Sequence, residues 1–378
     1  FFKQKTAYEI PKRDWSSDVC SSDLSRGSPE VGALNASVSR PFAELSPDAV
    51  LEAVESLGME CDGRLFALNS YENRVYQVGS PTHGMLVLKF YRPQRWTDAQ
   101  IVEELEFGTE LAAADLPVAA ALATGDRLLH QRAGLRFAVF PRLAARPAEI
   151  DARGSLELVG RTLGRMHAVG ARRRFLQRPA LSSDRLGWQA RDALLGSRFL
   201  EEMTRLGALD ASLIDKYAEV SAELLETVDE QIGHAGPVGQ MRLHGDCHLG
   251  NVLWNERGPI FVDLDDCMSG PRIQDLWMFL SGSLDERRGQ WQELAAGYRE
   301  FHHIDADELS LIEPLRALRM VHHSAWIATR WDDPAFPKAF PWFTSPRFWQ
   351  EHVSDLWQQL EVLRSGEYAD LEAGSPRA

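Results

Sequence analysis

Residues 243–254 read LHGDCHLGNVLW, and residues 258–266 read GPIFVDLDD. Both stretches place polar residues directly beside short apolar runs, so we expect a strand, a loop, a strand, a turn and a strand over residues 241–266. The loop between the first two strands holds the carboxylate of Asp246, two glycines and, five positions further on, the amide of Asn251. Few purely structural roles need that combination in so short a loop, and it therefore indicates a site that performs chemistry.

Three side chains of this segment suit the transfer of a phosphoryl group. Asp246 could accept the proton of a hydroxyl nucleophile. Asn251 and Asp263 could offer oxygen atoms to a hard cation, and Mg²⁺ in phosphotransfer sites prefers a carboxylate, an amide oxygen and the phosphates of a nucleotide. We therefore expect Asp246 to be a catalytic base and the other two residues to bind a metal ion.

Each of these residues also has a structural alternative. Asp246 could cap a turn, and Asn251 could satisfy backbone groups of the loop. For Asp265 and Asp266 we favour a structural role, because only one or two of several adjacent carboxylates can lie on a metal ion. We expect His244 to be a buried residue that hydrogen-bonds the loop rather than a catalytic one.

A second set of charged residues lies upstream, in residues 85–114. Both faces of the strand predicted over 85–91 are largely apolar, so Lys89 emerges among packed side chains and needs a partner. On the helix predicted over 98–114, Glu104 is the acid that shares a face with apolar residues. A Lys89–Glu104 ion pair would satisfy both groups and direct the ammonium group toward phosphates. The alternative is a surface lysine whose stem packs on apolar neighbours.

The composition is that of an ordinary globular protein, with 378 residues, 44% hydrophobic and 25% charged. The 41 basic and 55 acidic residues give a net charge of -14, which disfavours binding to nucleic acid. The sequence has no charge-free apolar run of about eighteen residues, so we expect no membrane span. The four cysteines are widely spaced and form no CxxC pair, which indicates a reducing, cytoplasmic compartment.

The chain is too long for one hydrophobic core, so we expect two lobes after an atypical start. Residues 1–34 have neither helical nor strand periodicity and resemble translated sequencing-adapter read-through, so they are a disordered tail or an artefact. Residues 35–140 are predicted to form a small antiparallel sheet with one long helix. Residues 141–378 are predicted to be mostly helical. The fold class is therefore α+β.

Two common nucleotide-binding motifs are missing. The sequence contains no GxxxxGK[ST] and no GxGxxG, which excludes a P-loop, a Rossmann site and the usual glycine-rich loop of protein kinases. Residues 67–76, ALNSYENRVY, instead form a polar turn between strands. Ser70 and the backbone N–H groups of this turn could cover a nucleotide.

The pattern HGDxxxxN followed by a strand and an aspartate resembles the aminoglycoside phosphotransferase/choline kinase branch of the protein-kinase-like fold. Longer segments are similar to the bacterial stress response kinase A family. They are ALNSYENRVYQ (67–77), KFYRPQRWT (89–97), LHGDCHLGNVLW (243–254) and FVDLDDCMSGPRIQDLWMFLSG (261–282). The similarity runs from about residue 44 to about residue 365.

The resemblance implies a bilobal, cytoplasmic serine/threonine protein kinase that uses ATP and Mg²⁺ and serves survival under stress. It also implies ATP and a protein with a Ser or Thr acceptor as partners, without nucleic acid or membrane, and we expect a monomer. Carried over by position, Asp246 is the proton acceptor and Asp263 is the second active-site aspartate. Asn251 and Asp263 are implied to bind Mg²⁺, and Ser70 and Lys89 to contact ATP, with Glu104 holding Lys89. Asp275 is implied to support the catalytic loop.

Two other functions stay open at this point. A small-molecule kinase of the same fold, of the aminoglycoside, choline or homoserine type, would have nearly the same catalytic loop, so the loop does not discriminate. A non-catalytic scaffold that binds nucleotide for stability is the second alternative. The joint presence of Lys89, Asp246, Asn251 and Asp263 argues against the scaffold.

Overall fold

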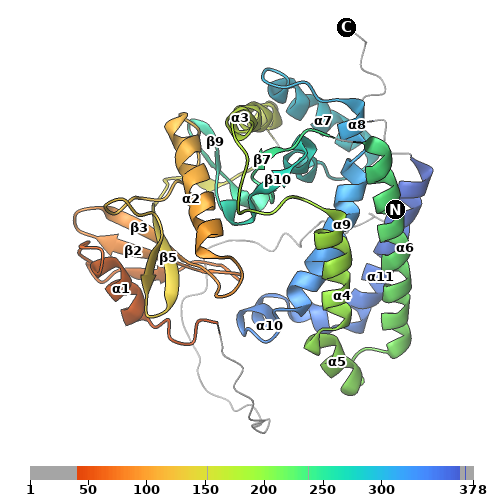
Figure 1. The fold of residues 1–378 in the computed structure, drawn as a ribbon, viewed down its shortest axis with the longest axis horizontal. Coiled ribbons are helices and arrows are strands. Elements are labelled where there is room, and N and C mark those ends of the chain that lie inside the picture. Colours follow the sequence, from red (N-terminus) through yellow and green to blue (C-terminus); the bar gives the residue numbers. More distant parts are fainter. Residues whose placement is uncertain (1–40, 151, 237, 367–370, 372–378) are drawn as a thin grey trace.

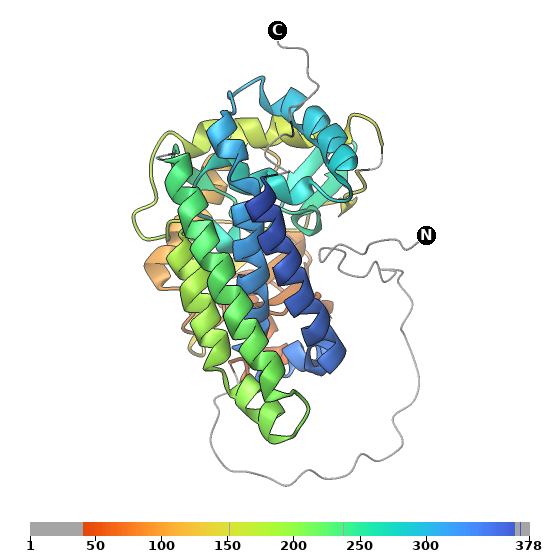
Figure 2. The same cartoon turned by 90° about the vertical axis from the view of Figure 1, so that its right-hand side faces the viewer.

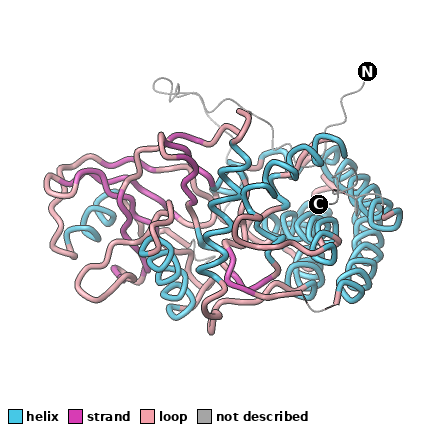
Figure 3. The backbone as a smooth tube through the Cα atoms, turned by 90° about the horizontal axis from the view of Figure 1, so that it is seen from above, coloured by secondary structure: helices cyan, strands magenta, loops and turns pink. Residues whose placement is uncertain are grey.

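The computed structural model describes residues 41–150, 152–236, 238–366 and 371. The predicted tail over 1–34 lies outside these ranges. Most strands gather at one end of the molecule and most helices at the other (Figure 3). Figure 1 shows the sheet and its helices as one lobe, in red to yellow, beside a larger helical lobe in green to blue. The predicted α+β, bilobal architecture is thus present.

The small lobe is a five-stranded antiparallel sheet with a helix on each face. The strand order is β1-β2-β3-β5-β4. The elements are α1 (Pro47–Glu55), β1 (Leu65–Ala67), β2 (Arg74–Ser80), β3 (Gly84–Phe90), α2 (Asp98–Ala113), β4 (His130–Arg132) and β5 (Leu135–Pro141). The N-terminus of α2 is fixed by a capping box, in which Thr97 and Gln100 each accept from the other's backbone N–H.

Alternation along β3 assigns its two faces as predicted. Leu86, Leu88 and Phe90 lie in a core cluster with residues of α1. Lys89 belongs to the opposite face, which packs on α2. The next residue on that face, Tyr91, lies in a second cluster with Ile101 and Leu105 of α2. The strand therefore delivers the lysine to the side of the sheet that faces the large lobe.

The large lobe is built mainly of helices. They are α3 (Ser155–Gly170), α4 (Gln189–Leu195), α5 (Arg198–Arg205), α6 (Ala211–Ala235), α7 (Leu284–Tyr298), α8 (Ala306–Leu309), α9 (Ile312–Ala328), α10 (Ala335–Ala339) and α11 (Pro346–Ser365). Helices α4, α6, α9 and α11 run side by side (Figure 2). Among the described helices, none is both long enough and apolar enough to cross a membrane.

Two small sheets interrupt the helices at the lobe boundary. Strand β7 (Met241–Leu243) pairs with β10 (Met268–Gly270), and β8 (Val252–Asn255) pairs with β9 (Gly258–Phe261) and with β6 (Arg146–Pro147). The strand predicted to run on to residue 266 ends at Phe261 instead. Asp263 adopts the left-handed region, with φ 63° and ψ 67°, and residues 264–266 form a 3-10 turn. A positive φ cannot continue a strand, so the chain turns at this aspartate.

Candidate active site

The carboxylate of Asp275 anchors the loop after β7 through two backbone hydrogen bonds. Its Oδ2 accepts from the backbone N–H of His244 at 2.7 Å, and its Oδ1 accepts from that of Gly245 at 2.8 Å. Gly245 has φ +87°, and a Cβ there would lie 2.1 Å from the carbonyl oxygen of Asp266. Only glycine therefore fits at this position. His244 is buried and its Nε2 donates to the carbonyl of Val262 at 3.0 Å, in agreement with the predicted structural role.

Asp246 follows this fixed segment and projects toward helix α9. Its Oδ1 lies 2.5 Å from Nη1 of Arg319, and its Oδ2 lies 3.4 Å from Nε2 of His248. Enclosure by the protein acts to raise the pKa of Asp246, but the charges of Arg319 and His248 outweigh it and hold the pKa well below its ordinary value. The carboxylate is therefore ionised at neutral pH, as a proton acceptor must be.

The register of the β8–β9 hairpin brings Asn251 beside Asp263. Val252 pairs with Phe261, and the N–H of Val262 donates to the carbonyl of Asn251 at 3.0 Å. The side-chain Nδ2 of Asn251 donates to the backbone oxygen of Asp246 at 3.0 Å, which leaves its Oδ1 available to a ligand. The side chain of Asp263 is about half exposed, at 52%. The register thus places the two residues at neighbouring backbone positions, and the carboxylate of Asp263 is accessible.

The side-chain oxygens of Asn251 and Asp263 fit a hard cation shared with a nucleotide. In the described part of the chain, no group of three or more His, Cys, Asp and Glu side chains is arranged to hold a metal ion. A cation on Asn251 and Asp263 would have to complete its shell with water and phosphate oxygens. That is the mode in which proteins commonly bind Mg²⁺.

Lys89 is buried among three carboxylates. Its Nζ lies 3.1 Å from Oε1 of Glu104, 3.0 Å from Oδ1 of Asp263 and 3.0 Å from Oδ1 of Asp265. The predicted Lys89–Glu104 pair is therefore present. Burial acts to lower the pKa of Lys89, but the three carboxylates raise it well above its ordinary value. Burial, reinforced by the charge of Asp265, raises the pKa of Glu104 to about 7, although Lys89 acts to lower it.

The structural role favoured for Asp265 takes the form of ion pairs in this cluster. Besides Lys89, Asp265 contacts Nη1 of Arg95, and Arg95 also lies 2.5 Å from Oδ1 of Asp266. Burial raises the pKa of Asp265, but Arg95 and Lys89 overcome that effect and lower it. Asp265 thus links the lysine of the sheet to the turn after Asp263. Its adjacency to Asp263 was the one local signal for this role.

Ser70 lies in the turn between β1 and β2, where its hydroxyl is used to shape the loop. Its Oγ accepts from the N–H of Val75 at 3.1 Å and donates to the carbonyl of Leu68 at 3.4 Å. The structure brings Lys89, Glu104 and Asp263 into contact, and it brings Asn251 to Asp246. It shows no contact between Ser70 and these residues within the described chain. The predicted nucleotide contact of Ser70 remains a prediction.

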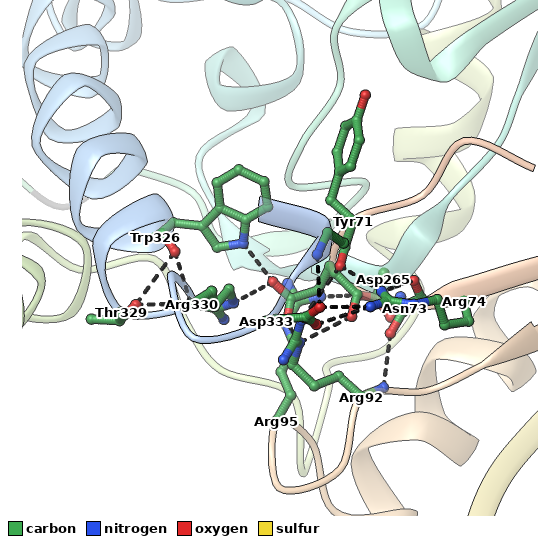
Figure 4. Close-up of polar contacts among 12 residues, drawn as sticks. Tyr71, Asn73, Arg74, Arg92, Arg95, Asp265, Trp326, Thr329, Arg330 and Asp333 are labelled. Carbon is green, nitrogen blue, oxygen red and sulfur yellow. Dashed lines mark hydrogen bonds and ion pairs between the residues drawn. The ribbon is translucent and has the colours of Figure 1, made fainter. Parts of the chain in front are cut away.

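An interlobe cluster, which sequence reasoning did not find, joins this turn to the large lobe (Figure 4). We define it as Glu72, Arg74 and Arg92 of the small lobe with Trp326, Arg330 and Asp333 of the large lobe. Asp333 lies 2.8 Å from Nη2 of Arg74 and 2.6 Å from Nη2 of Arg92. Oε2 of Glu72 lies 2.5 Å from both Nε of Arg330 and Nε1 of Trp326.

Comparisons with known proteins agree with the geometry. A family described as "Phosphotransferase enzyme family" matches residues 65–312. Stress response kinase A of Escherichia coli (strain K12) is 42% identical over 328 residues, which cover 85% of this chain and 95% of the relative. Serine/threonine protein kinase RdoA of Salmonella typhimurium is 40% identical over 322 residues, which cover 85% and 94%. The chain belongs to the stress response kinase A family.

Membership of the stress response kinase A family makes the chain a phosphotransferase. Solved structures of lower identity share its fold. Amicoumacin kinase hAmiN in complex with AMP-PNP, Ca²⁺ and Ami has a TM-score of 0.61 at 17% identity, with 85% of this chain and 94% of that chain covered. Spectinomycin phosphotransferase in complex with ADP and spectinomycin has a TM-score of 0.58 at 16% identity, with 85% and 98% covered. These likenesses show the protein-kinase-like fold.

Proposed function

We propose that this chain is a cytoplasmic, ATP- and Mg²⁺-dependent serine/threonine protein kinase that acts in a stress response. The observation that carries the proposal is the cluster at the lobe boundary, in which Lys89 lies 3.0 Å from Asp263, beside Asn251 and Asp246. A buried lysine, a paired glutamate, an amide and two aspartates are the parts that kinases use on a nucleotide. The name of one relative at 40% identity, serine/threonine protein kinase RdoA, supports a protein acceptor.

In this proposal the nucleotide lies between a small lobe of residues 35–140 and a large lobe of residues 141–378. Lys89 holds its phosphates, Glu104 and Asp265 hold the lysine, and Ser70 with its turn covers the phosphates. When bound on Asn251 and Asp263, Mg²⁺ supplies positive charge against the phosphoryl oxygens. The excess of carboxylates around Lys89 prepares the site for that added cation.

Asp246 orients the acceptor hydroxyl and takes its proton. The hydroxyl oxygen forms a bond to the γ-phosphorus, and the bond from this phosphorus to the β–γ bridging oxygen breaks. ADP leaves with that electron pair, and the proton passes to Oδ1 or Oδ2 of Asp246. The short segment held by Asp275 fixes the base relative to the metal ligands.

The direct test incubates the purified chain with Mg²⁺ and γ-labelled ATP. Acceptors are generic Ser/Thr proteins, such as casein and myelin basic protein, and a panel of small hydroxyl compounds. Label on Ser or Thr of a protein is the expected result. Label on small compounds alone would assign the chain to the small-molecule kinases instead. Nucleotide binding with no transfer to either class would favour a scaffold.

Replacing Asp263 with alanine should weaken binding of the Mg²⁺–nucleotide complex by at least about tenfold, or about 1.4 kcal/mol. The reason is the loss of one of the two oxygen donors proposed for the cation. Titration of a fluorescent ATP analogue with and without Mg²⁺ measures the effect. Binding of the metal-free nucleotide should change much less.

The matched control for this prediction is Asp266→Ala. It removes a carboxylate three residues away that contacts Arg95. This variant should keep the wild-type response to Mg²⁺. If Asp263→Ala also responded to Mg²⁺ as the wild type does, the metal assignment of Asp263 would be wrong.

A further inference from the structure

Helix α9 is buried on every side except one. Among its residues, all of which the structure describes, the partly exposed side chains are Arg319, His322, His323 and Trp326. These positions have the spacing i, i+3, i+4 and i+7, which places them on one face of the helix. We call this face the α9 stripe. A polar stripe on an otherwise buried helix points to a partly enclosed surface rather than to the core.

The α9 stripe runs from the catalytic loop to the turn at Glu72. At one end, Nη1 of Arg319 lies 2.5 Å from Oδ1 of Asp246. At the other end, Nε1 of Trp326 lies 2.5 Å from Oε2 of Glu72 (Figure 4). An acceptor whose hydroxyl reaches Asp246 from this side must therefore lie along the stripe.

Arg319 supplies the charge of the stripe. Burial, reinforced by the charge of Arg319, lowers the pKa of His323 to about 3. Burial also lowers the pKa of His322 to about 4, and Arg319 again acts in that direction. Both imidazoles are therefore neutral at pH 7, and the stripe contacts the carboxylates of Asp246 at Arg319 and of Glu72 at Trp326. A substrate that lies along the stripe meets a guanidinium group beside the catalytic base.

We propose that Arg319 selects acceptors with negative charge beside the phosphorylated hydroxyl, such as a serine or threonine in an acidic protein segment. This inference rests on the proposed function, and it specifies the acceptor class. When Asp246 takes the proton of the hydroxyl, it loses the charge that pairs with Arg319. A carboxylate on the acceptor gives the guanidinium a replacement partner of ideal geometry.

A cationic acceptor meets the opposite situation. An ammonium group beside the reacting hydroxyl, as in choline or an aminoglycoside, would lie near Arg319 with like charge. Like-charge contacts at a binding site reject the wrong partner. Arg319 therefore disfavours a cationic acceptor at this site.

The test measures peptide binding by fluorescence anisotropy. The full chain is saturated with Mg²⁺ and a non-hydrolysable ATP analogue, and three labelled peptides carry one serine flanked by glutamates, alanines or arginines. The acidic peptide should bind at least about tenfold tighter than the basic one. Arg319→Met should bring that ratio close to one, and Arg319→Lys should keep most of it. Arg172→Ala, which removes an exposed arginine after α3, should leave the ratio unchanged.

Four results would overturn the proposal: equal binding of the three peptides, tighter binding of the basic peptide, no binding of any peptide, or a preference that persists in Arg319→Met. Transfer of label from ATP to the serine is measured in parallel. Binding with the expected preference but without transfer would refute the protein-kinase function and would still support the charge selectivity of Arg319.

Discussion

Replacing Asp246 with asparagine is expected to lower the rate of phosphoryl transfer by roughly 10²- to 10⁴-fold, because an amide cannot take the hydroxyl proton. The substitution changes the shape of the side chain little, and the segment before it is held by Asp275 through backbone N–H groups. Lys89, which is proposed to contact the nucleotide, lies in the small lobe, whereas Asp246 lies in the large lobe. Nucleotide affinity should therefore stay close to that of the wild type.

Two measurements check this result. Transfer from γ-labelled ATP gives the rate, and titration with a fluorescent nucleotide gives the affinity. Asp266→Asn serves as the control, since it removes a carboxylate of the same region that contacts Arg95 rather than the catalytic loop. A rate for Asp246→Asn within about tenfold of the wild-type rate would exclude Asp246 as the base.

Replacing Asp333 with alanine is expected to lower the free energy of unfolding by about 3–5 kcal/mol. The side chain of Asp333 is 3% exposed, and it pairs with Arg74 and Arg92, whose side chains are 20% and 10% exposed. Removing the shared carboxylate leaves two guanidinium groups without that partner at the junction of the lobes. Urea unfolding followed by tryptophan fluorescence measures the loss.

Asp332 provides the matched control one residue away. Its side chain is 54% exposed and pairs with Arg198 at 3.3 Å. An exposed pair of this kind contributes about 0–1 kcal/mol, so Asp332→Ala should have little effect. Asp333→Asn, which keeps hydrogen-bond acceptance, should be intermediate. A loss for Asp333→Ala no greater than for Asp332→Ala would show that the interlobe cluster does not stabilise the protein.

Local periodicity was enough to predict the Lys89–Glu104 pair. Strand alternation gave the face of Lys89, and helical spacing gave the face of Glu104. The two elements are close in sequence, so a short connection places them side by side. Likewise, a tight turn between two strands brings Asn251 to Asp263, and the predicted hairpin is the one observed.

The contacts of Arg319 and Asp333 could not be predicted in this way. Arg319 lies 73 residues from Asp246, and Asp333 lies 259 residues from Arg74. No local pattern fixes which loop a helix of the large lobe will meet, because that depends on how α9 packs among the other helices. The sequence nevertheless held one signal that this face of α9 is not part of the core. Arg319, His322, His323 and Trp326 form a polar stripe on an otherwise mostly apolar helix, which marks a face exposed to something other than the core.

The interlobe cluster also constrains how such a sequence can change over time. Asp333 is the shared anion for Arg74 and Arg92, and Glu72 is the shared anion for Arg92 and Arg330 and accepts from the Trp326 indole. A lineage that loses Asp333 leaves Arg74 without its carboxylate partner, and one that loses Glu72 does the same to Arg330, unless the arginines change as well. These positions, far apart along the chain, are therefore expected to covary among relatives as one set joined through Arg92.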